Sequence, residues 1–463
     1  MAYASINPYT GETLATFPDA TDDEVRTAIA RAHDAFLSWR ETSFGERVRV
    51  LQKAADILRR DADDYAKLLT LEMGKIIEEA RAEVELSAKI LEYYVRNAEV
   101  LLQPQKLPVL DPSEGESMLV HEPLGVLLAI EPWNFPYYQV ARIAAPQLAA
   151  GNTLLLKHAS NVPQSAAAFE KLLREAGLPE GGFRNLYATR SQLAMILEDP
   201  RVQGVALTGS EGAGASVAAQ AGKALKKSTM ELGGADAFVV LADADLEKTT
   251  KWAVFGRHWN AGQVCCSSKR TIVVDPIYDT FLDRYRQGVA GLVAGDPFYP
   301  ATTLAPLSSI GAADELKDKI QEAVKHGAKA EEVGPPVPNQ GAFVQPTILT
   351  EVGEDNPARY WEFFGPVSML FRAKDEDDAV RIANDSPFGL GGSVFTSNPA
   401  YGAEVAKRIS TGMVFVNHPT RVEADLPFGG VRRSGYGREL IGLGLKEFVN
   451  HKLISVVDID ARF

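Results

Sequence analysis

From about residue 118 onward, short apolar runs alternate with stretches whose apolar residues recur at helical spacing. Helix-like segments begin near residues 136, 163, 191 and 212. The alternation predicts a mostly parallel sheet with helices on both faces, and such sheets bind ligands at the carboxyl ends of their strands. The pattern resumes after residue 266, which predicts a second α/β domain. The strand-like runs are LGVLLAI, NTLLLK, VQGVALTGS, DAFVVLADAD, TIVV, FVQPTILT, VSMLF, GGSVFT and GMVFVN.

The first hundred residues follow a different pattern. INPYTGETLATF predicts two strands joined by a tight turn. Thr21 and Glu24 form a capping-box pattern before a helix, and helix-like sequence continues from about 46 to 102. The polar, proline-containing stretch 103–117 predicts a connector to the alternating region.

Net charge, the length of the apolar runs and the number of cysteines limit the class of protein to which the chain can belong. The chain has 463 residues and a formal net charge of −13, so it has no general attraction for nucleic acid or an anionic membrane. Its apolar runs are shorter than the ~18 residues that span a bilayer, and MAYASINPYTGETL lacks the pattern of a secretory signal. Two cysteines cannot build a disulfide framework. We therefore expect a cytoplasmic protein with no membrane or nucleic-acid partner.

The usual metal and phosphate signatures are missing. The seven histidines are scattered, HExxH and CxxC do not occur, and we expect no metal site. GxGxxG and the P-loop pattern are also missing, which leaves dinucleotide binding by another kind of loop open.

Both cysteines lie side by side in NAGQVCCSSKR, residues 260–270. A helix-like stretch precedes them and the strand-like TIVV follows, so they occupy a connection between elements, where reactive groups are often displayed. Neighbouring side chains point different ways, so at most one is a nucleophile. A free thiol with a pKa of ~8.5 needs activation by its surroundings. On these grounds alone, a catalytic and a structural role both stay open.

Six motifs in order make the chain recognisable. The sequence resembles the aldehyde dehydrogenase superfamily over essentially its whole length, and Cys265 aligns with the family's nucleophile. Cys266 is then a packing neighbour or, alternatively, a redox partner that reversibly blocks Cys265. The motifs are PWNFP (132–136), TGS (208–210), ELGG (231–234), GQVC (262–265), EFFGP (362–366) and PFGG (427–430).

The resemblance implies a reaction at Cys265. Its thiolate adds to an aldehyde, and the oxyanion is stabilised by the Asn134 amide and the backbone N–H of Cys265. Loss of one such donor typically costs ~3–4 kcal/mol. Hydride transfer to a nicotinamide leaves a thioester, and Glu231 is the implied general base for its hydrolysis, with a pKa that partial burial would raise.

The resemblance also implies a nicotinamide cofactor. Lys157 corresponds to a lysine at the adenosine ribose, and Ser160 stands where many NAD-preferring members have a glutamate that repels a 2′-phosphate. We therefore expect NADP to be preferred, with NAD also accepted. The remaining expected cofactor residues are Trp133, Gly209, Ser210, Gly214, Glu362 and Phe364.

Arg142 is the candidate for substrate recognition. It follows Asn134 by eight residues inside an apolar helix-like stretch, and a buried arginine needs an anion. Relatives that oxidise succinic semialdehyde carry an arginine here, so a substrate carboxylate is one interpretation and an internal salt bridge is the other. Trp259 stands where some of them have a second arginine. Arg421 would replace that cation, although Glu423 and Asp425 beside it would oppose an anion.

Succinic semialdehyde is therefore the expected substrate, with glutaric semialdehyde or a neutral aliphatic aldehyde as alternatives. A thiol esterase that uses Cys265 and Glu231 without a cofactor, or a binding protein that has lost activity, are further hypotheses. Turnover of acetyl esters without a cofactor would favour the esterase. Inertness to thiol-directed reagents would favour the binding protein.

The resemblance implies two doubly wound α/β domains and a small oligomerisation hairpin, hence a homodimer or homotetramer. The expected cofactor domain comprises residues 1–112 and 124–233, and the expected catalytic domain comprises residues 234–443. The expected oligomerisation element comprises residues 113–123 and 444–463, including the strand-like HKLISVVD.

Overall fold

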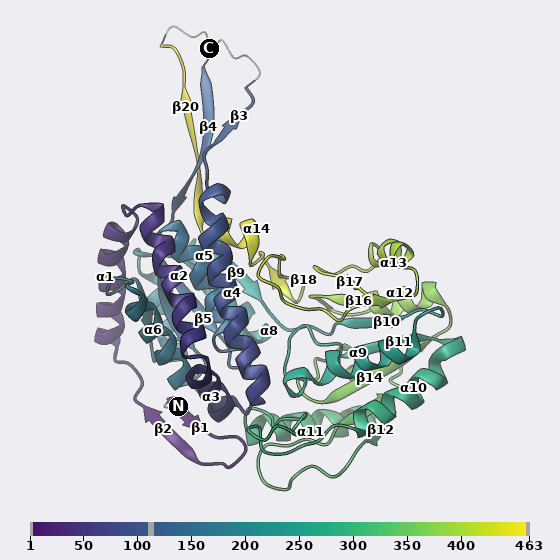
Figure 1. Cartoon of the computed structure of the whole chain (residues 1–463). Coiled ribbons are helices and arrows are strands. Elements are labelled where there is room, and N and C mark those ends of the chain that lie inside the picture. The colour runs from purple at the N-terminus through teal and green to yellow at the C-terminus, as the bar shows by residue number, and fades with distance from the viewer. Residues whose placement is uncertain (1–2, 110–114, 460–463) are drawn as a thin grey trace.

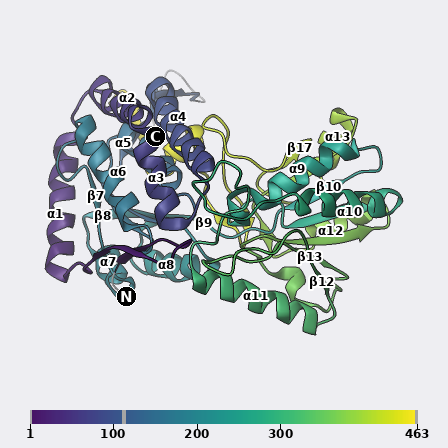
Figure 2. The same ribbon diagram turned by 60° about the horizontal axis from the view of Figure 1, so that its bottom comes forward.

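The computed structural model describes residues 3–109 and 115–459. Two α/β lobes lie side by side and a narrow sheet projects from the first (Figure 1). After a rotation of 60°, α1 and α10 lie at opposite ends of the molecule (Figure 2). The predicted α/β class is confirmed. Residues 1–2, 110–114 and 460–463, which include parts of the expected domain boundaries, lie outside the described residues.

The first lobe is built on a six-stranded sheet whose neighbouring strands are parallel, except for antiparallel β19 at one edge. β19 comes from within the stretch expected for the catalytic domain and pairs with β9. In spatial order the strands are β19 (Gly435–Tyr436), β9 (Lys227–Glu231), β8 (Val202–Thr208), β5 (Val126–Glu131), β6 (Thr153–His158) and β7 (Phe183–Asn185).

Alternating side chains of this sheet pack into two hydrophobic cores, one on each face. Leu127 and Ala129 of β5 face α5 and α6, behind which α2 and α4 pack, whereas Val126 and Leu128 face α1, α7 and α8. Helices on both faces agree with the sequence pattern. The helices are α1 (Asp22–Trp39), α2 (Phe44–Arg60), α3 (Ala62–Met73), α4 (Ile77–Leu101), α5 (Tyr138–Ala150), α6 (Pro163–Ala176), α7 (Leu193–Glu198) and α8 (Glu211–Lys223).

The second lobe contains a seven-stranded sheet, parallel apart from its β12 edge. α9 (Leu246–His258) and α10 (Asp275–Ala290) pack on one face. The other face is covered by α11 (Ile310–Lys325), α12 (Glu376–Asn384) and α13 (Pro399–Ala406). The strand order is β12 (Lys329–Glu332), β13 (Thr347–Thr350), β14 (Val367–Ala373), β11 (Arg270–Val274), β10 (Ala237–Val240), β16 (Gly392–Phe395) and β17 (Phe415–Val416).

The projecting sheet joins distant parts of the chain. β20 (Val449–Val456) pairs antiparallel along β4 (Glu116–Pro123), which also pairs with β3 (Gln105–Leu107). The short helix α14 (Ile441–Lys446) leads from the first lobe into β20.

Two smaller sheets complete the fold. β1 (Tyr3–Ile6) pairs with β2 (Thr13–Phe17), and β15 (Phe388–Gly389) pairs with β18 (Val431–Arg432). The hairpin expected at the start of the chain and the capping box of α1 are both present.

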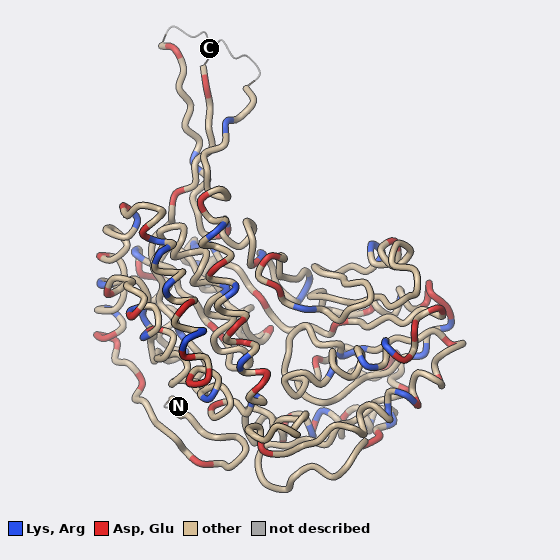
Figure 3. Tube along the Cα trace, viewed as in Figure 1, with Lys and Arg blue, Asp and Glu red and all other residues tan. Residues whose placement is uncertain are grey.

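Basic and acidic residues are interspersed along both lobes (Figure 3). In the part of the chain that the structure describes, no helix has both the length and the apolar character needed to cross a bilayer. The same described ranges contain no cluster of three or more His, Cys, Asp or Glu side chains that could hold a metal ion.

Candidate active site

Four polar residues stand in a row where parallel strands of the first sheet end. In the strand pairing, Thr208 is the partner of Glu231, and Glu131 is the partner of His158. Ile130 pairs with Leu207, which sets Glu131 beside Thr208 across the middle of the row. Carboxyl ends of parallel strands are where such folds place their ligands.

The chain leaving β5 carries Asn134, which is buried at 3% exposure. Its side-chain Nδ2 donates to the carbonyl of Gln263 at 3.0 Å, two residues before Cys265. Its backbone carbonyl accepts from Lys75 Nζ at 2.9 Å and from Asn260 Nδ2 at 3.1 Å. These bonds join the asparagine loop to the cysteine loop, although 131 positions separate Asn134 from Cys265 (265 − 134).

A left-handed turn presents the thiol. α9 ends at His258, and Asn260, Ala261 and Gly262 have φ values of 51°, 53° and 76°. A Cβ at Gly262 would collide with the carbonyl of Gly365, so this position requires glycine. The turn redirects the chain so that Cys265 is half-buried while Cys266 is packed in the core at 1% exposure.

The surroundings favour the thiolate of Cys265. A hydrogen bond from the Cys266 thiol lowers the pKa of Cys265, the positive charges of Lys269 and Arg142 lower it further, and burial acts in the opposite direction. The same contact and burial raise the pKa of Cys266 well above its ordinary value. The two adjacent thiols are therefore chemically distinct.

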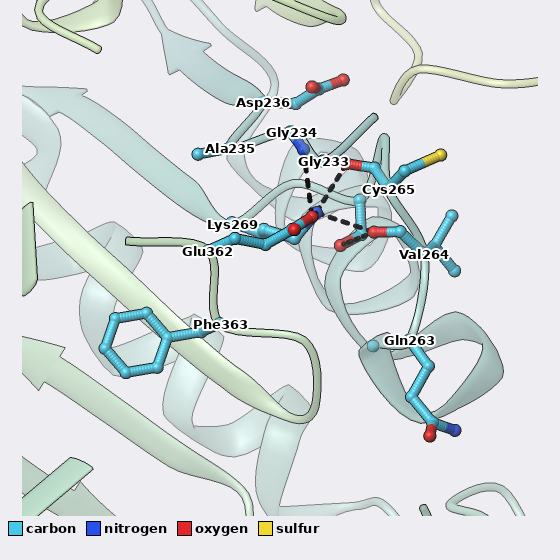
Figure 4. A network of polar contacts seen from close by, with 12 residues as sticks. Gly233, Gly234, Ala235, Asp236, Gln263, Val264, Cys265, Lys269, Glu362 and Phe363 are labelled. Atoms are coloured by element: carbon cyan, nitrogen blue, oxygen red, sulfur yellow. Dashed lines mark hydrogen bonds and ion pairs between the residues drawn. The ribbon is translucent and has the colours of Figure 1, made fainter. Parts of the chain in front are cut away.

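Lys269 connects three loops at the site (Figure 4). Its buried ammonium donates to the carbonyls of Val264 and Cys265 at 2.7 and 2.6 Å. It also forms an ion pair with Glu362 at 3.1 Å. Glu362 in turn accepts from the backbone N–H of Gly234 at 3.0 Å. The ELGG, cysteine and EFFGP motifs thus meet at one buried cation.

Glu231 ends β9 with 2% of its surface exposed. Neither carboxylate oxygen has a hydrogen-bond partner among the described residues. Burial raises its pKa to about 8, the charge of Arg142 pulls that pKa down, and that of Cys265 pushes it up. A carboxyl group with such a pKa is suited to proton transfer near neutral pH.

Arg142 lies on α5 at 1% exposure, between the strand ends and the aromatic wall of the site. It forms an ion pair with Glu439 and donates to the Tyr138 hydroxyl at 2.7 Å and to Thr208 Oγ1 at 2.9 Å. Its guanidinium also stacks on the rings of Tyr138 and Phe428. The structure therefore contains the internal salt bridge that the sequence left open as the alternative to a substrate carboxylate.

The cavity beside the thiol is mainly apolar. Trp259 occupies its wall where a second arginine was considered, and Val422 also lines it. Arg421 lies next to Val422 with its side chain 49% exposed, and it forms an ion pair with Glu423 at 3.3 Å. The lining residues are Leu86, Phe135, Tyr138, Gln139, Trp259, Val264, Cys265, Cys266, Val422 and Phe428.

Comparison with known proteins decides the family. The aldehyde dehydrogenase family model matches residues 1–454. The chain belongs to the aldehyde dehydrogenase family.

Among curated relatives of this aldehyde dehydrogenase is the succinate-semialdehyde dehydrogenase [NADP(+)] of Deinococcus radiodurans. It is 49% identical over 98% of this chain and 94% of that protein. The Mycobacterium avium protein of the same name is 45% identical over 98% and 97%. A solved succinic semialdehyde dehydrogenase from Streptococcus pyogenes, in complex with NADP+, superposes with a TM-score of 0.96 at 45% identity and covers 99% of this chain and 100% of that one.

Lys157 and Ser160 are the residues expected at the adenosine end of a dinucleotide. Lys157 is half-buried at the end of β6 over the ring of Tyr3, and burial lowers its pKa to about 8. The negative charge of Asp19 acts on this pKa in the opposite direction. Ser160 is exposed three residues later. A lysine partly removed from water fits an anionic ligand.

The expected pyrophosphate loop leads into α8. Gly209 continues from β8, and Ser210 caps the helix by accepting from Ala213 N–H at 3.4 Å. A Cβ at Gly214 would collide with Leu232, so glycine lets α8 pack closely on the sheet. The remaining N–H groups of this first turn face outward from the helix start, a fit for phosphate oxygens.

Among the residues expected near the nicotinamide, Phe364 and Trp133 pack edge to face, with ring centroids 5.7 Å apart. Both rings are partly exposed, and Glu362 keeps 21% of its side chain exposed beside Lys269. Trp133, Lys157, Ser160, Gly209 and Ser210 thus lie at strand ends or on the loops that follow them. Gly214 lies in the first turn of α8, and Glu362 and Phe364 lie on the segment that precedes β14.

Three residues at the site were missed by sequence reasoning. Lys269 lies four positions after Cys265, but its ion-pair partner Glu362 is remote in sequence. Glu131 directly precedes the PWNFP motif at the end of an apolar strand, a position that could have drawn attention. Glu439 had no local signal, because its partner Arg142 is 297 residues away (439 − 142).

Proposed function

We propose that the protein oxidises succinic semialdehyde to succinate, with NADP as the preferred hydride acceptor and NAD as a weaker one. The observation that carries the proposal is a thiol with a lowered pKa, Cys265, in one site with a buried, unpartnered carboxyl group and a buried amide. The names of the curated relatives support the substrate and the cofactor.

Cys265 is the proposed nucleophile. Its thiolate adds to the aldehyde carbon, and the carbonyl oxygen becomes an oxyanion that Asn134 Nδ2 and the Cys265 N–H stabilise. The Asn134 amide is already held against the cysteine loop through Gln263, so little reorganisation is needed. A bound nicotinamide supplies the acceptor for the hydride that the resulting thiohemiacetal releases.

Glu231 is the proposed general base for the thioester that remains on Cys265. As a carboxylate it removes a proton from water, which attacks the acyl carbon and frees the thiolate. Its pKa of about 8 means that it is mostly protonated at neutral pH. Hydrolysis should therefore quicken as pH rises toward 8.

The proposed carboxylate-binding residue is Arg142, with Arg421 at the rim of the cavity. Arg142 stacks against Tyr138 and Phe428, both of which line the cavity beside Cys265. A substrate carboxylate would compete with Glu439 for the guanidinium, whose planar donors suit bidentate pairing. The apolar lining also favours the alternative of a neutral aliphatic aldehyde, which would need no cation.

NADP preference is proposed from Lys157 and Ser160, which offer a cation and a neutral donor where a 2′-phosphate would lie. Trp133, Gly209, Ser210, Gly214, Glu362 and Phe364 are the proposed contacts to the rest of the cofactor. The solved relative from Streptococcus pyogenes in complex with NADP+ supports NADP as the cofactor.

We further propose a cytoplasmic homodimer or homotetramer that associates through the projecting sheet. Support comes from β20, where Leu453 and Val456 are 60% and 65% exposed. Exposed apolar side chains on an outlying strand are typical of an interface.

A panel of aldehydes with both nicotinamides tests the function. The proposal predicts the highest kcat/KM for succinic semialdehyde with NADP, lower values for glutaric semialdehyde and for a neutral four-carbon aldehyde, and none with Cys265→Ser. Arg142→Ala should remove the advantage of the acid substrate over the neutral aldehyde. Equal kcat/KM ratios in parent and Arg142→Ala would remove the carboxylate assignment, and ester turnover without any aldehyde oxidation would favour the esterase.

A further inference from the structure

A buried ion pair lies behind the asparagine loop. Lys75 is in the connection between α3 and α4, Glu83 is on α4, and the two charged side chains contact each other at 0% and 1% exposure. Neither belongs to the motifs that identify the family. Their burial removes two charges from water. The free-energy cost of this desolvation is offset only if each charge is paired and also makes further hydrogen bonds.

Both partners bind the backbone of the loop that carries Asn134. Lys75 Nζ donates to the Asn134 carbonyl at 2.9 Å and lies 3.7 Å from the centroid of the Phe135 ring. Glu83 Oε1 accepts from the N–H groups of Tyr137 and Tyr138 at 2.8 and 3.2 Å. The pair therefore fixes both ends of the segment 134–138, at the start of α5.

A contribution to the stability of the fold does not by itself explain why this buried ion pair is present. Replacement of a buried ion pair by apolar residues is often neutral or stabilising, whereas removal of one partner leaves an uncompensated charge. What the pair adds is directionality: one charge holds a carbonyl and the other holds two N–H groups. Displacement of a catalytic donor by about 1 Å can cost about a hundredfold in rate.

We propose that Lys75 and Glu83 are positioning residues for the oxyanion donor Asn134. They act through the backbone of residues 134–138 and touch neither substrate nor cofactor. The inference rests on the proposed aldehyde oxidation, because it concerns an oxyanion that forms in that reaction.

The chain offers a matched control. Glu72 on α3 is also fully buried, and it accepts from the N–H groups of Gln164 and Ser165 at 2.9 and 2.8 Å at the start of α6. It is a capping carboxylate of the same kind that holds a different helix. Glu83→Gln and Glu72→Gln should both lower Tm, but only Glu83→Gln should lower kcat, by about tenfold or more, with KM changed less.

A double variant separates positioning from folding. Lys75→Met with Glu83→Gln removes both buried charges, so Tm should recover relative to Glu83→Gln while kcat stays low. Active sites are counted by alkylation of Cys265, so that kcat refers to folded enzyme. Recovery of kcat together with Tm would overturn the proposal.

A double-mutant cycle tests whether the pair acts through Asn134. Asn134→Ala should itself lower kcat, and Glu83→Gln should then lower kcat by less than twofold in that background, because the donor to be positioned is gone. An equal fold-loss from Glu83→Gln in both backgrounds, or the same kcat loss from Glu72→Gln, would contradict the inference. A parent protein without aldehyde oxidation would instead contradict the proposed function.

Discussion

At the scale of single residues, the adjacent thiols show how one contact separates two identical groups. Cys266 is buried next to Cys265, and their interaction lowers the pKa of Cys265 and raises that of Cys266. The sequence identified the pair and the family's nucleophile. The effect of Cys266 on the pKa of Cys265 could be recognised only in the structure, as could that of Lys269, whose positive charge also lowers this pKa.

Cys266→Ala should raise the pKa of Cys265, because it removes the hydrogen bond that most lowers that pKa. Below the pKa the thiolate fraction then falls, so alkylation by iodoacetamide at neutral pH should slow several-fold and its pH profile should move to higher pH. Mass spectrometry of the Cys265 peptide measures both. An unchanged profile would show that Cys266 only packs.

Glu131 is a second buried carboxyl group at the strand ends, and burial raises its pKa from 4.5 to about 8. The folded state therefore keeps a proton that the unfolded state loses between pH 4.5 and 8, so the contribution of Glu131 to stability is fully present below pH 4.5 and is lost as pH rises through 8. The full effect of one such proton is about 1.4 kcal/mol per pH unit.

Glu131→Gln removes this ionisation. Between pH 5 and 8, we expect the Tm of the variant to fall less steeply than that of the parent. Differential scanning fluorimetry at several pH values measures the two slopes, and parallel curves would show that Glu131 does not hold a proton in the folded protein.

At the scale of elements, local patterns predicted the strands because each apolar run is bounded by turn residues and followed by a helix. They also predicted the capping box of α1. They could not predict β19, which has two residues and joins the first sheet after a path through the whole second lobe. The left-handed backbone of Asn260 and Ala261 was equally hidden, since neither residue requires that conformation.

The difference between local patterns and long-range pairing also explains why only some of the residues at the strand ends could be predicted from the sequence. Lys157 lies near the end of a strand that the apolar pattern delimits. Glu231 ends β9, which was not among the expected strands, and it was found through the ELGG motif. The order in which those strands lie side by side comes from long-range pairing, and so does the salt bridge between Arg142 and Glu439. The family motifs therefore gave the proposed roles of the site residues, whereas their ion-pair and hydrogen-bond partners came from tertiary contacts.

The connection after β6 gives a prediction about cofactor choice. Ser160→Glu places a carboxylate on this exposed loop three residues after Lys157. Repulsion of a 2′-phosphate should lower kcat/KM for NADP by about tenfold or more, equivalent to about 1.4 kcal/mol, and leave that for NAD within a factor of a few. Steady-state kinetics with both cofactors measures the ratio, and an equal loss for both would place the 2′-phosphate elsewhere.

At the scale of the whole molecule, the projecting sheet is the most distinctive feature (Figure 1). β20 runs along β4 for eight paired residues, and apolar side chains on it remain exposed. The two lobes, by contrast, bury their apolar faces against their own helices. We infer that this outlying sheet completes its packing against a second copy.

Leu453→Asp on β20 should weaken association, because it places a charge on the exposed apolar surface. Leu225→Asp is the matched control, since Leu225 is 93% exposed in the turn after α8. Sedimentation velocity over a concentration series should show a smaller species for Leu453→Asp only. The same sedimentation coefficient for parent, control and variant would contradict an interface at this position of β20.

The most direct measurement of the central claim is the mass of the Cys265 peptide after one turnover. Glu231→Gln, mixed with succinic semialdehyde and NADP, should form up to one equivalent of reduced cofactor per site and retain a succinyl group on Cys265, because hydrolysis lacks its base. Formation of reduced cofactor with Cys265 unmodified, or with the acyl group on another residue, would contradict the account.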